Sequence, residues 1–232
     1  AYLSIAGNFD EEQVRQWIET YFGSIPSKNI PDRQLPKEPK QQELRRIKHH
    51  AFVESNALIV MWHCSARMAK TYPSEDILSD VLGSGRSSRC QKELIDKQQL
   101  FADLNVYVLG SLDPGLLVFE GRLHDGVSHQ AAEDALWKMV ETLQTKGLTD
   151  QEFEKVINKT LTDQAMDDLQ LQNIAYNLSF FASQGDTNGI NTESDLYNKL
   201  KASDIQEAAC RVLSQSNASV IHYCKTGASS TS

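Results

Sequence analysis

The sequence predicts an α+β fold, with a mostly antiparallel sheet of about six strands and helices packed on one face of that sheet. Two pairs of strand-like segments, 44–53 with 57–64 and 103–110 with 116–123, are each joined by a short turn and have the pattern of hairpins. Helical segments lie between and after these pairs, and a last strand-like run covers 218–224. Hairpins interspersed with helices are typical of an antiparallel sheet that is covered on one side.

The first part of the chain combines a strand, a helix and a linker. Residues 2–6 alternate as a strand does, and Asp10 followed by Gln13 forms a capping-box pattern at a helix start. The apolar residues of this helix share one face before Gly23 ends it: Val14, Trp17, Ile18, Tyr21 and Phe22. Residues 24–43 hold four of the six prolines and predict an extended polar linker.

The rest of the chain is mostly helical. Helices are predicted at 72–82, 87–97, 127–146, 149–182, 193–200 and 203–214. Thr149 and Glu152 form a second capping box, and Ser203 is the expected cap of the last helix. We expect residues 1–225 to form a single domain and residues 226–232 to be a disordered tail.

Composition and charge exclude several classes of protein. Of 232 residues, 40% are hydrophobic and 23% charged, as in an ordinary globular protein. The net charge of −8 argues against a nucleic-acid partner, because proteins that bind nucleic acid usually present a basic face. No apolar run approaches the ~20 residues of a membrane-spanning helix. The four cysteines form no C-x-x-C pair, which favours free thiols over a zinc finger: Cys64, Cys90, Cys210 and Cys224.

The chain opens directly in a strand-like run. The sequence does not begin with Met, and its first residues contain neither a basic segment nor an apolar signal core. We therefore expect Ala1 to lie inside a longer polypeptide, so that an active site would be incomplete here.

No catalytic motif is visible. Zinc peptidases commonly place two histidines four residues apart on a helix, with a glutamate as general base. None of the six histidines lies in an H-x-x-E-H or H-E-x-x-H frame: His49, His50, His63, His124, His129 and His222. The chain also lacks the G-x-S-x-G motif of serine hydrolases. We predict no catalytic residue and no metal ligand in this chain, and the substrate-binding residues stay unknown.

A glycine- and serine-rich segment, Gly83–Arg89, is superficially similar to a phosphate-binding loop. It lacks the G-K-[ST] ending and does not follow a strand of the βαβ type. We favour a turn whose serines cap the next helix.

Four segments carry short motifs. The first reads G-N-F-D, then a helix, then Y-F-G-S-I-P, and the second reads L-G-S-G-R-S-S-R from Leu82. The third reads L-T-D-Q-E-F from Leu148, and the fourth reads A-S-D-I-Q from Ala202, ahead of the last strand. In this order they resemble the second, non-catalytic domain of the pitrilysin/insulinase-type (M16) zinc peptidases, which include relatives of the mitochondrial processing peptidase.

The resemblance implies a module of a clam-shaped peptidase. In that family two halves, each of two α+β domains, enclose a chamber, and the H-x-x-E-H zinc motif lies in the domain that would precede Ala1. The opposite half often supplies an Arg and a Tyr from a segment written L-R-x6-Y. The matching positions here are Ile95 and Ala102, which cannot clamp a carbonyl oxygen or donate a hydroxyl.

Two interpretations follow from the resemblance, and we favour the first. In the first, the chain is the supporting domain of a zinc metalloendopeptidase and contributes chamber wall and subunit contacts, with zinc in the upstream catalytic domain. In the second, it belongs to a degenerate half that serves assembly, like the core subunits of the respiratory bc1 complex. A third alternative is an unrelated α+β binding domain.

The first interpretation also implies partners. They are the upstream catalytic domain, a second peptidase half from the same or another chain, and a peptide substrate, and the chain could also form a homodimer. The sequence leaves the compartment open, with the bacterial cytoplasm or periplasm favoured.

Overall fold

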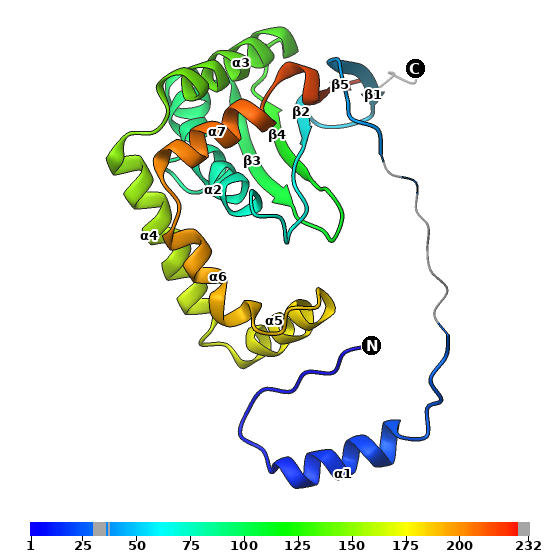
Figure 1. Ribbon diagram of the computed structural model, residues 1–232. Helices are drawn as coiled ribbons and strands as arrows, with labels where there is room; N and C mark the ends of the chain where they lie inside the picture. Colours follow the sequence, from blue (N-terminus) through cyan, green and yellow to red (C-terminus); the bar gives the residue numbers. More distant parts are fainter. Residues whose placement is uncertain (30–35, 37, 227–232) are drawn as a thin grey trace.

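A five-stranded sheet forms the centre of the protein in the computed structural model, which describes residues 1–29, 36 and 38–226 (Figure 1). The strands are β1 (Arg45–Ala51), β2 (Ala57–His63), β3 (Phe101–Leu109), β4 (Leu116–Leu123) and β5 (Ala218–Lys225). They lie in the order β1-β5-β2-β4-β3. The predicted α+β class is confirmed.

The sheet differs from the prediction in strand number and in one direction. It has five strands in the described part of the chain rather than about six, and β1 runs parallel to β5, with Arg45 opposite Ser219. Residues 2–6, the expected additional strand, are described but do not pair with the sheet. A strand needs a neighbour for its backbone hydrogen bonds, so an alternating pattern alone does not create one.

One of the two predicted hairpins is correct and the other is wrong. β3 and β4 pair as an antiparallel hairpin, whereas β5 lies between β1 and β2. The connection from β1 to β2 therefore passes around the end of β5. Its Asn56 side chain accepts a hydrogen bond from the Lys225 backbone N–H at 2.8 Å, which fastens the connection to β5.

One face of the sheet is buried under helices. Along β2, Leu58, Val60 and Trp62 are buried while their neighbours are half-buried. The core above them comes from α2 (Tyr72–Gly83), α3 (His129–Lys146) and α7 (Ala202–Val212), which lie over the sheet in Figure 1. Trp62 meets Trp137 of α3 edge to face, with ring centroids 5.9 Å apart. The prediction that helices pack on one face of the sheet is therefore confirmed.

Several helix boundaries follow from the capping residues in the sequence. Asp10 accepts a hydrogen bond from the Gln13 N–H at 2.8 Å at the start of α1 (Glu11–Phe22). Thr149 and Glu152 form the predicted capping box of α4 (Asp150–Asp167). Gly147 ends α3 with a φ of +65°, a conformation that favours glycine.

Other helices deviate from the prediction. The helix expected over 149–182 is interrupted after α4, and α5 (Leu171–Ser183) follows. Asp167 and Asp168 lie at the break, where their negative charges interact unfavourably with the negative end of the α4 dipole. The segment predicted as a helix over 87–97 contains a π-helix, η1 (Gln91–Lys97). The last helix, α7, begins at Ala202, so the expected cap Ser203 lies inside it. Lys201 is the N-cap residue, and its backbone N–H donates to the Asp204 carboxylate at 2.8 Å.

α6 (Gly189–Asn198) is fastened to the helical layer by two polar contacts. The Tyr197 hydroxyl donates to Asp76 of α2 at 2.6 Å, and Glu193 forms an ion pair with Arg67. A short 3-10 helix, η2 (Gln215–Asn217), leads into β5. α6 therefore belongs to the packed body of the protein.

α1 lies apart from the sheet and its helices in Figure 1, below the region of α5. The predicted linker connects it to β1, and residues 30–35 and 37 of that linker lie outside the described residues, as do residues 227–232 of the predicted tail. Within the described ranges, no helix has the length and apolarity that crossing a bilayer requires.

Candidate functional site

The sheet face opposite the helices carries side chains from all five strands. On β2, Ile59 and Met61 alternate with the buried residues, and Ile221 of β5 lies directly across from Ile59. The larger apolar residues of this open sheet face are Ile47, Ile59, Met61, Tyr107, Leu109, Leu116, Val118, Ile221 and Tyr223. Contiguous apolar surface of this kind marks an interaction site.

Charged side chains border the open sheet face at one end. Arg122 of β4 pairs with Asp103 of β3 at this end, whereas Glu120, two residues along β4, lies directly opposite Ile59. The hydrogen bond from Arg122 holds the pKa of the Asp103 carboxyl below its ordinary value. The pair is exposed, so its contribution to stability is small. It forms a polar edge beside the apolar surface.

Linker residues close the other end of this face. The buried Gln41 side chain donates to the Ala218 carbonyl at 2.6 Å and accepts from the Ser219 hydroxyl at 3.3 Å. Glu38 lies 3.7 Å from His63 at the end of β2. The end of the linker is thus fixed on the sheet, whereas the centre of the face is left open by the described residues.

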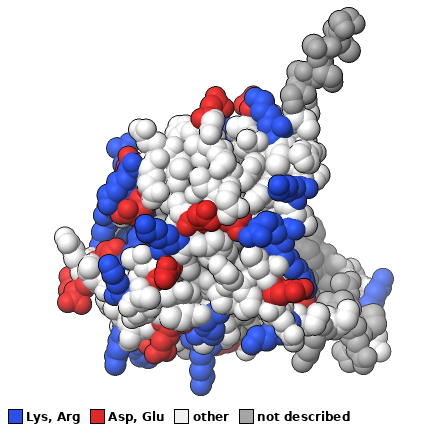
Figure 2. Space-filling view, turned by 90° about the horizontal axis from the view of Figure 1, so that it is seen from above, with Lys and Arg blue, Asp and Glu red and all other residues white. Residues whose placement is uncertain are grey.

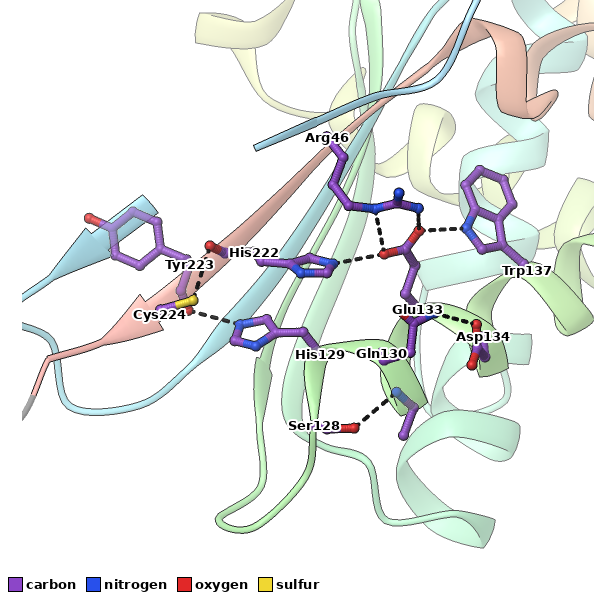
Figure 3. A network of polar contacts seen from close by, with 11 residues as sticks. Arg46, Ser128, His129, Gln130, Glu133, Asp134, Trp137, His222, Tyr223 and Cys224 are labelled. Carbon is purple, nitrogen blue, oxygen red and sulfur yellow. Dashed lines mark hydrogen bonds and ion pairs between the residues drawn. The ribbon is translucent and has the colours of Figure 1, made fainter. Parts of the chain in front are cut away.

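A buried polar network lies on the helical side of the sheet (Figure 3). Glu133 of α3 accepts from the Arg46 guanidinium at 2.6 Å and lies 2.7 Å from Nε2 of His222. A carboxylate only accepts, so Nε2 of His222 carries the shared proton. Trp137 donates to the same carboxylate at 3.1 Å. Three elements, β1, β5 and α3, meet at this one side chain.

The electrostatics of Glu133 show why this network is stable. Burial raises the pKa of the Glu133 carboxyl, but the hydrogen bonds from Arg46, Trp137 and His222 outweigh burial and hold the pKa below its ordinary value. Glu133 is 1% exposed, so removing its charge partners would leave an uncompensated buried carboxylate. The network fastens the edge strand β1 to the body.

Two stacked histidines adjoin the network. His129 lies on His222 with ring centroids 4.9 Å apart, and the Nε2 of His129 is 3.1 Å from the Tyr223 carbonyl while that of His222 is bonded to Glu133. Each Nε2 faces an oxygen acceptor and therefore acts as a hydrogen-bond donor, which ties α3 to β5. Among the described residues, no group of three or more His, Cys, Asp or Glu side chains is placed to hold a metal ion.

A second buried carboxylate, Glu75, fastens α2 to its surroundings. It accepts from the Ser65 backbone N–H at 2.7 Å, from the Ser65 hydroxyl at 2.8 Å and from Arg211 of α7 at 2.9 Å. Each contact joins the start of α2 to the end of β2 or to α7, which indicates a structural role.

The positions singled out in the sequence are also structural. Ile95 packs against the core from η1, and Ala102 is exposed on β3 beside a bulge. The loop Gly83–Arg89 ends in Arg89, whose guanidinium binds Glu152 and the Gly147 carbonyl. Cys90 rather than a serine is the N-cap residue of η1, and no side chain caps this helix. The structure therefore brings none of these residues to a shared site in its described part.

The Glu133 network was missed by the sequence analysis, although the sequence contained a signal for it. Glu133 shares one helix face with Leu136 and Val140, both of which are buried. A charged residue on an apolar face predicts a buried, paired carboxylate. Its partners come from strands 87 or more residues away and could not be identified from spacing.

The surface charge is mixed. Figure 2 shows Lys and Arg side chains interspersed with Asp and Glu on the face seen from above. The net charge of −8 is therefore not concentrated as one acidic field on this face.

Comparisons with known proteins place this geometry in a family. Residues 1–160 match the family described as the peptidase M16 inactive domain. The chain is 24% identical over 214 residues to the zinc protease PqqE of Helicobacter pylori, covering 90% of this chain and 48% of that protein.

Two solved structures show the same fold. A protease from Helicobacter pylori has a TM-score of 0.85 at 22% identity, over 94% of this chain and 54% of that one. The inactive peptidase domain of a Bordetella parapertussis protein assigned as a zinc protease has a TM-score of 0.70 at 24% identity, over 76% of this chain and 96% of that one.

These findings agree with the sequence motifs and exclude an unrelated binding domain. The chain spans about half the length of the Helicobacter pylori proteins that it matches. It is similar to zinc proteases but corresponds to their non-catalytic part. The chain belongs to the peptidase M16 inactive domain family.

Proposed function

We propose that the chain is the supporting domain of a zinc metalloendopeptidase that hydrolyses peptides in an enclosed chamber. The zinc and its general base lie in another domain of the longer protein, and this domain contributes chamber wall and contacts to the other half. The observation that carries the proposal is the open sheet face, a mainly apolar surface that spans all five strands of a family member.

The open sheet face has the chemistry of a chamber wall. Its centre, Ile59, Met61 and Ile221, is half-buried and apolar, and suits the side chains of an unfolded peptide. Its charged border at Arg122 and Asp103 keeps the rim hydrated, and Glu120 lies next to Ile59 on the face itself. A wall of this kind holds many peptides without a strict sequence preference, because apolar contact is not directional.

The two edges of the sheet offer a second mode of peptide contact. β1 and β3 each have one neighbour within the described sheet, so one side of each strand has backbone groups that are not used by the ladder. An extended peptide pairs with such an edge through main-chain hydrogen bonds. β1 carries Arg45, Lys48 and two exposed histidines, which favours acidic segments at that edge.

The first test is the zinc content of the natural polypeptide at its full length, measured beside this chain. We expect about one zinc per full-length molecule and none in this chain, because the catalytic zinc sites of peptidases use three protein ligands. The full-length protein is then expected to cleave unfolded peptides. Zinc in this chain alone would contradict the proposal, and the absence of both zinc and cleavage in the full-length protein would favour the assembly role.

The second test addresses the wall itself. Ile221→Glu places a charge at the centre of the open sheet face, and Thr142→Glu places the same charge on an exposed position of α3 as a control. We expect the first variant to lower kcat/KM for a long peptide in the full-length enzyme about tenfold or more, and the control to leave it unchanged. Equal activity of both variants, at equal zinc content, would show that the face does not contact substrate.

A further inference from the structure

A small cavity lies in the helical layer, between the end of α2, the loop that follows it, the start of η1 and α4. Its volume is about 200 Å³. Val81 of α2 and Val156 of α4 line it and are both buried, so part of its lining is apolar. Pockets for drug-sized molecules commonly measure ~300–1,000 Å³, so this cavity suits a smaller ligand. Because α2 covers the other side of the sheet, the cavity is separate from the open sheet face.

Three lysines line the cavity: Lys92 of η1 and Lys155 and Lys159 of α4. The two lysines of α4 are four residues apart and share one face of the helix, where like charges repel each other. Lys159 pairs with Asp163, whereas Lys92 and Lys155 form no ion pair with any residue that the structure describes. Two lysines without a counter-charge therefore line one small cavity, which favours an anion.

The loop between α2 and η1 adds hydroxyl groups to this lining, from Ser84, Ser87 and Ser88. Ser88 is 4% exposed, and its hydroxyl accepts a long hydrogen bond from the Gln91 backbone N–H at 3.4 Å. Among the described residues, the hydroxyls of Ser87 and Ser88 find no acceptor for their own protons. A buried hydroxyl that donates no hydrogen bond is unfavourable, so an acceptor inside the cavity would satisfy it.

Two carboxylates also line the cavity, Glu152 of α4 and Asp80 of α2. Glu152 accepts from the Arg89 guanidinium at 3.0 Å, so its charge is compensated. Asp80 accepts from the Thr160 hydroxyl at 3.2 Å. Burial raises the pKa of the Asp80 carboxyl above its ordinary value, and the hydrogen bond from Thr160 offsets this in part. Of the two, Asp80 is therefore the carboxylate that opposes a bound anion.

A phosphate group matches the remaining chemistry of the cavity. A phosphate monoester carries about 1.5 to 2 negative charges at neutral pH and accepts hydrogen bonds on three oxygens. Lysines bind phosphate as point charges, and serine hydroxyls donate hydrogen bonds to it. A carboxylate has a single charge and two oxygens, so it would leave part of this lining unused. The two valines leave an apolar wall for a short organic group beside the phosphate.

We propose that this cavity binds the phosphate group of a small phosphate monoester. Lys92 and Lys155 pair with the phosphate, and the hydroxyls of Ser87 and Ser88 donate to its oxygens. The segment Gly83–Arg89 is then one side of a phosphate site that differs from a G-K-[ST] loop, because its lysines come from η1 and α4. A bound phosphate joins this loop to α4. The proposal does not depend on the proposed function.

Calorimetric titration of this chain at constant ionic strength tests the site, with inorganic phosphate, ethyl phosphate and acetate as the probes. We expect one ethyl phosphate to bind per chain with a Kd of about 1 mM or lower. Inorganic phosphate should bind more weakly, because it lacks the apolar group, and acetate at least about tenfold more weakly. No saturable binding of either phosphate would overturn the proposal. Binding of acetate as tight as that of ethyl phosphate would reject phosphate as the ligand, and tighter binding of inorganic phosphate would reject the monoester.

Three variants locate the bound phosphate. Lys155→Gln removes an exposed positive charge from the cavity, and Lys138→Gln removes the same charge from an exposed position on α3 as the control. We expect Lys155→Gln to weaken the binding of ethyl phosphate at least about fivefold and the control to leave it unchanged. Asp80→Asn retains an acceptor for Thr160 but removes the opposing charge, so it should bind ethyl phosphate at least about threefold more tightly. Equal affinity of Lys155→Gln and the control, or no gain in affinity for Asp80→Asn, would place the phosphate outside this cavity.

Discussion

Helices α1 and α7 have similar lengths and clear amphipathic patterns, but α7 is packed in the core and α1 is exposed. α7 has 11 residues and buries Ile205, Ala208, Ala209 and Val212 against the sheet and its neighbours. α1 has 12 residues and buries none of them, although all are described. An amphipathic pattern thus predicts that a helix needs a partner, but it does not predict that the partner lies in the same folded unit.

The largest expected effect is a loss of stability of the folded body, residues 45–226, with no change in the N-terminal arm, residues 1–26. Trp62→Ala removes a side chain that is 1% exposed and packs edge to face on Trp137. We expect a loss of about 3–5 kcal/mol in the free energy of unfolding, because the change leaves a large cavity. Trp17→Ala, the equivalent change in the arm, should cost less than about 1 kcal/mol in this chain. Urea unfolding of both variants measures the difference, and equal losses would mean that α1 is packed in this chain.

An intermediate effect is expected at the Glu133 network. Glu133→Gln keeps the shape but removes the charge that pairs with Arg46 and His222. We expect a loss of about 2–3 kcal/mol, since a buried charge partner is left unsatisfied. Glu141→Gln, on the exposed side of the same helix, is the control and should change little. An unchanged unfolding midpoint for Glu133→Gln would show that the network does not fasten β1.

The pH dependence of stability should follow the same carboxylate. The folded protein holds the pKa of Glu133 below its ordinary value of 4.5, so the unfolded chain binds the proton more readily. The stability from this group is therefore present above pH 4.5 and is lost as the pH falls through the folded pKa. We expect the stability difference between the native chain and Glu133→Gln to shrink on acidification, as followed by thermal unfolding at a series of pH values. A difference that stays constant would assign the stabilisation to packing.

The smallest expected effect comes from removing the arm. Deletion of residues 1–35 leaves Gln41 and its contacts to β5 in place. We expect the free energy of unfolding to change by less than about 0.5 kcal/mol, because few contacts join the arm to the body. A clear loss of stability would place the arm inside the folded unit of this chain.

Local chemistry explains what could be predicted from the sequence. Asp10, Thr149 and Gly147 set helix ends through contacts within three or four residues, and these boundaries are confirmed. The insertion of β5 between β1 and β2 depends on contacts across most of the chain, and a short connection at 54–56 gives no sign of it. The same holds for the Glu133 network, in which a helix residue meets two strands that are distant in sequence.

The position of β5 also has a consequence for biosynthesis. β5 is the last of these five strands to leave the ribosome, yet it lies inside the sheet, between β1 and β2. Until residues 218–225 emerge, β1 has no neighbour within the described sheet and β2 is paired on one side alone. During translation the sheet of the nascent chain therefore lacks its central strand. A premature stop before Ala218 would leave the edge of β2 unpaired, and unpaired strand edges of this kind promote aggregation.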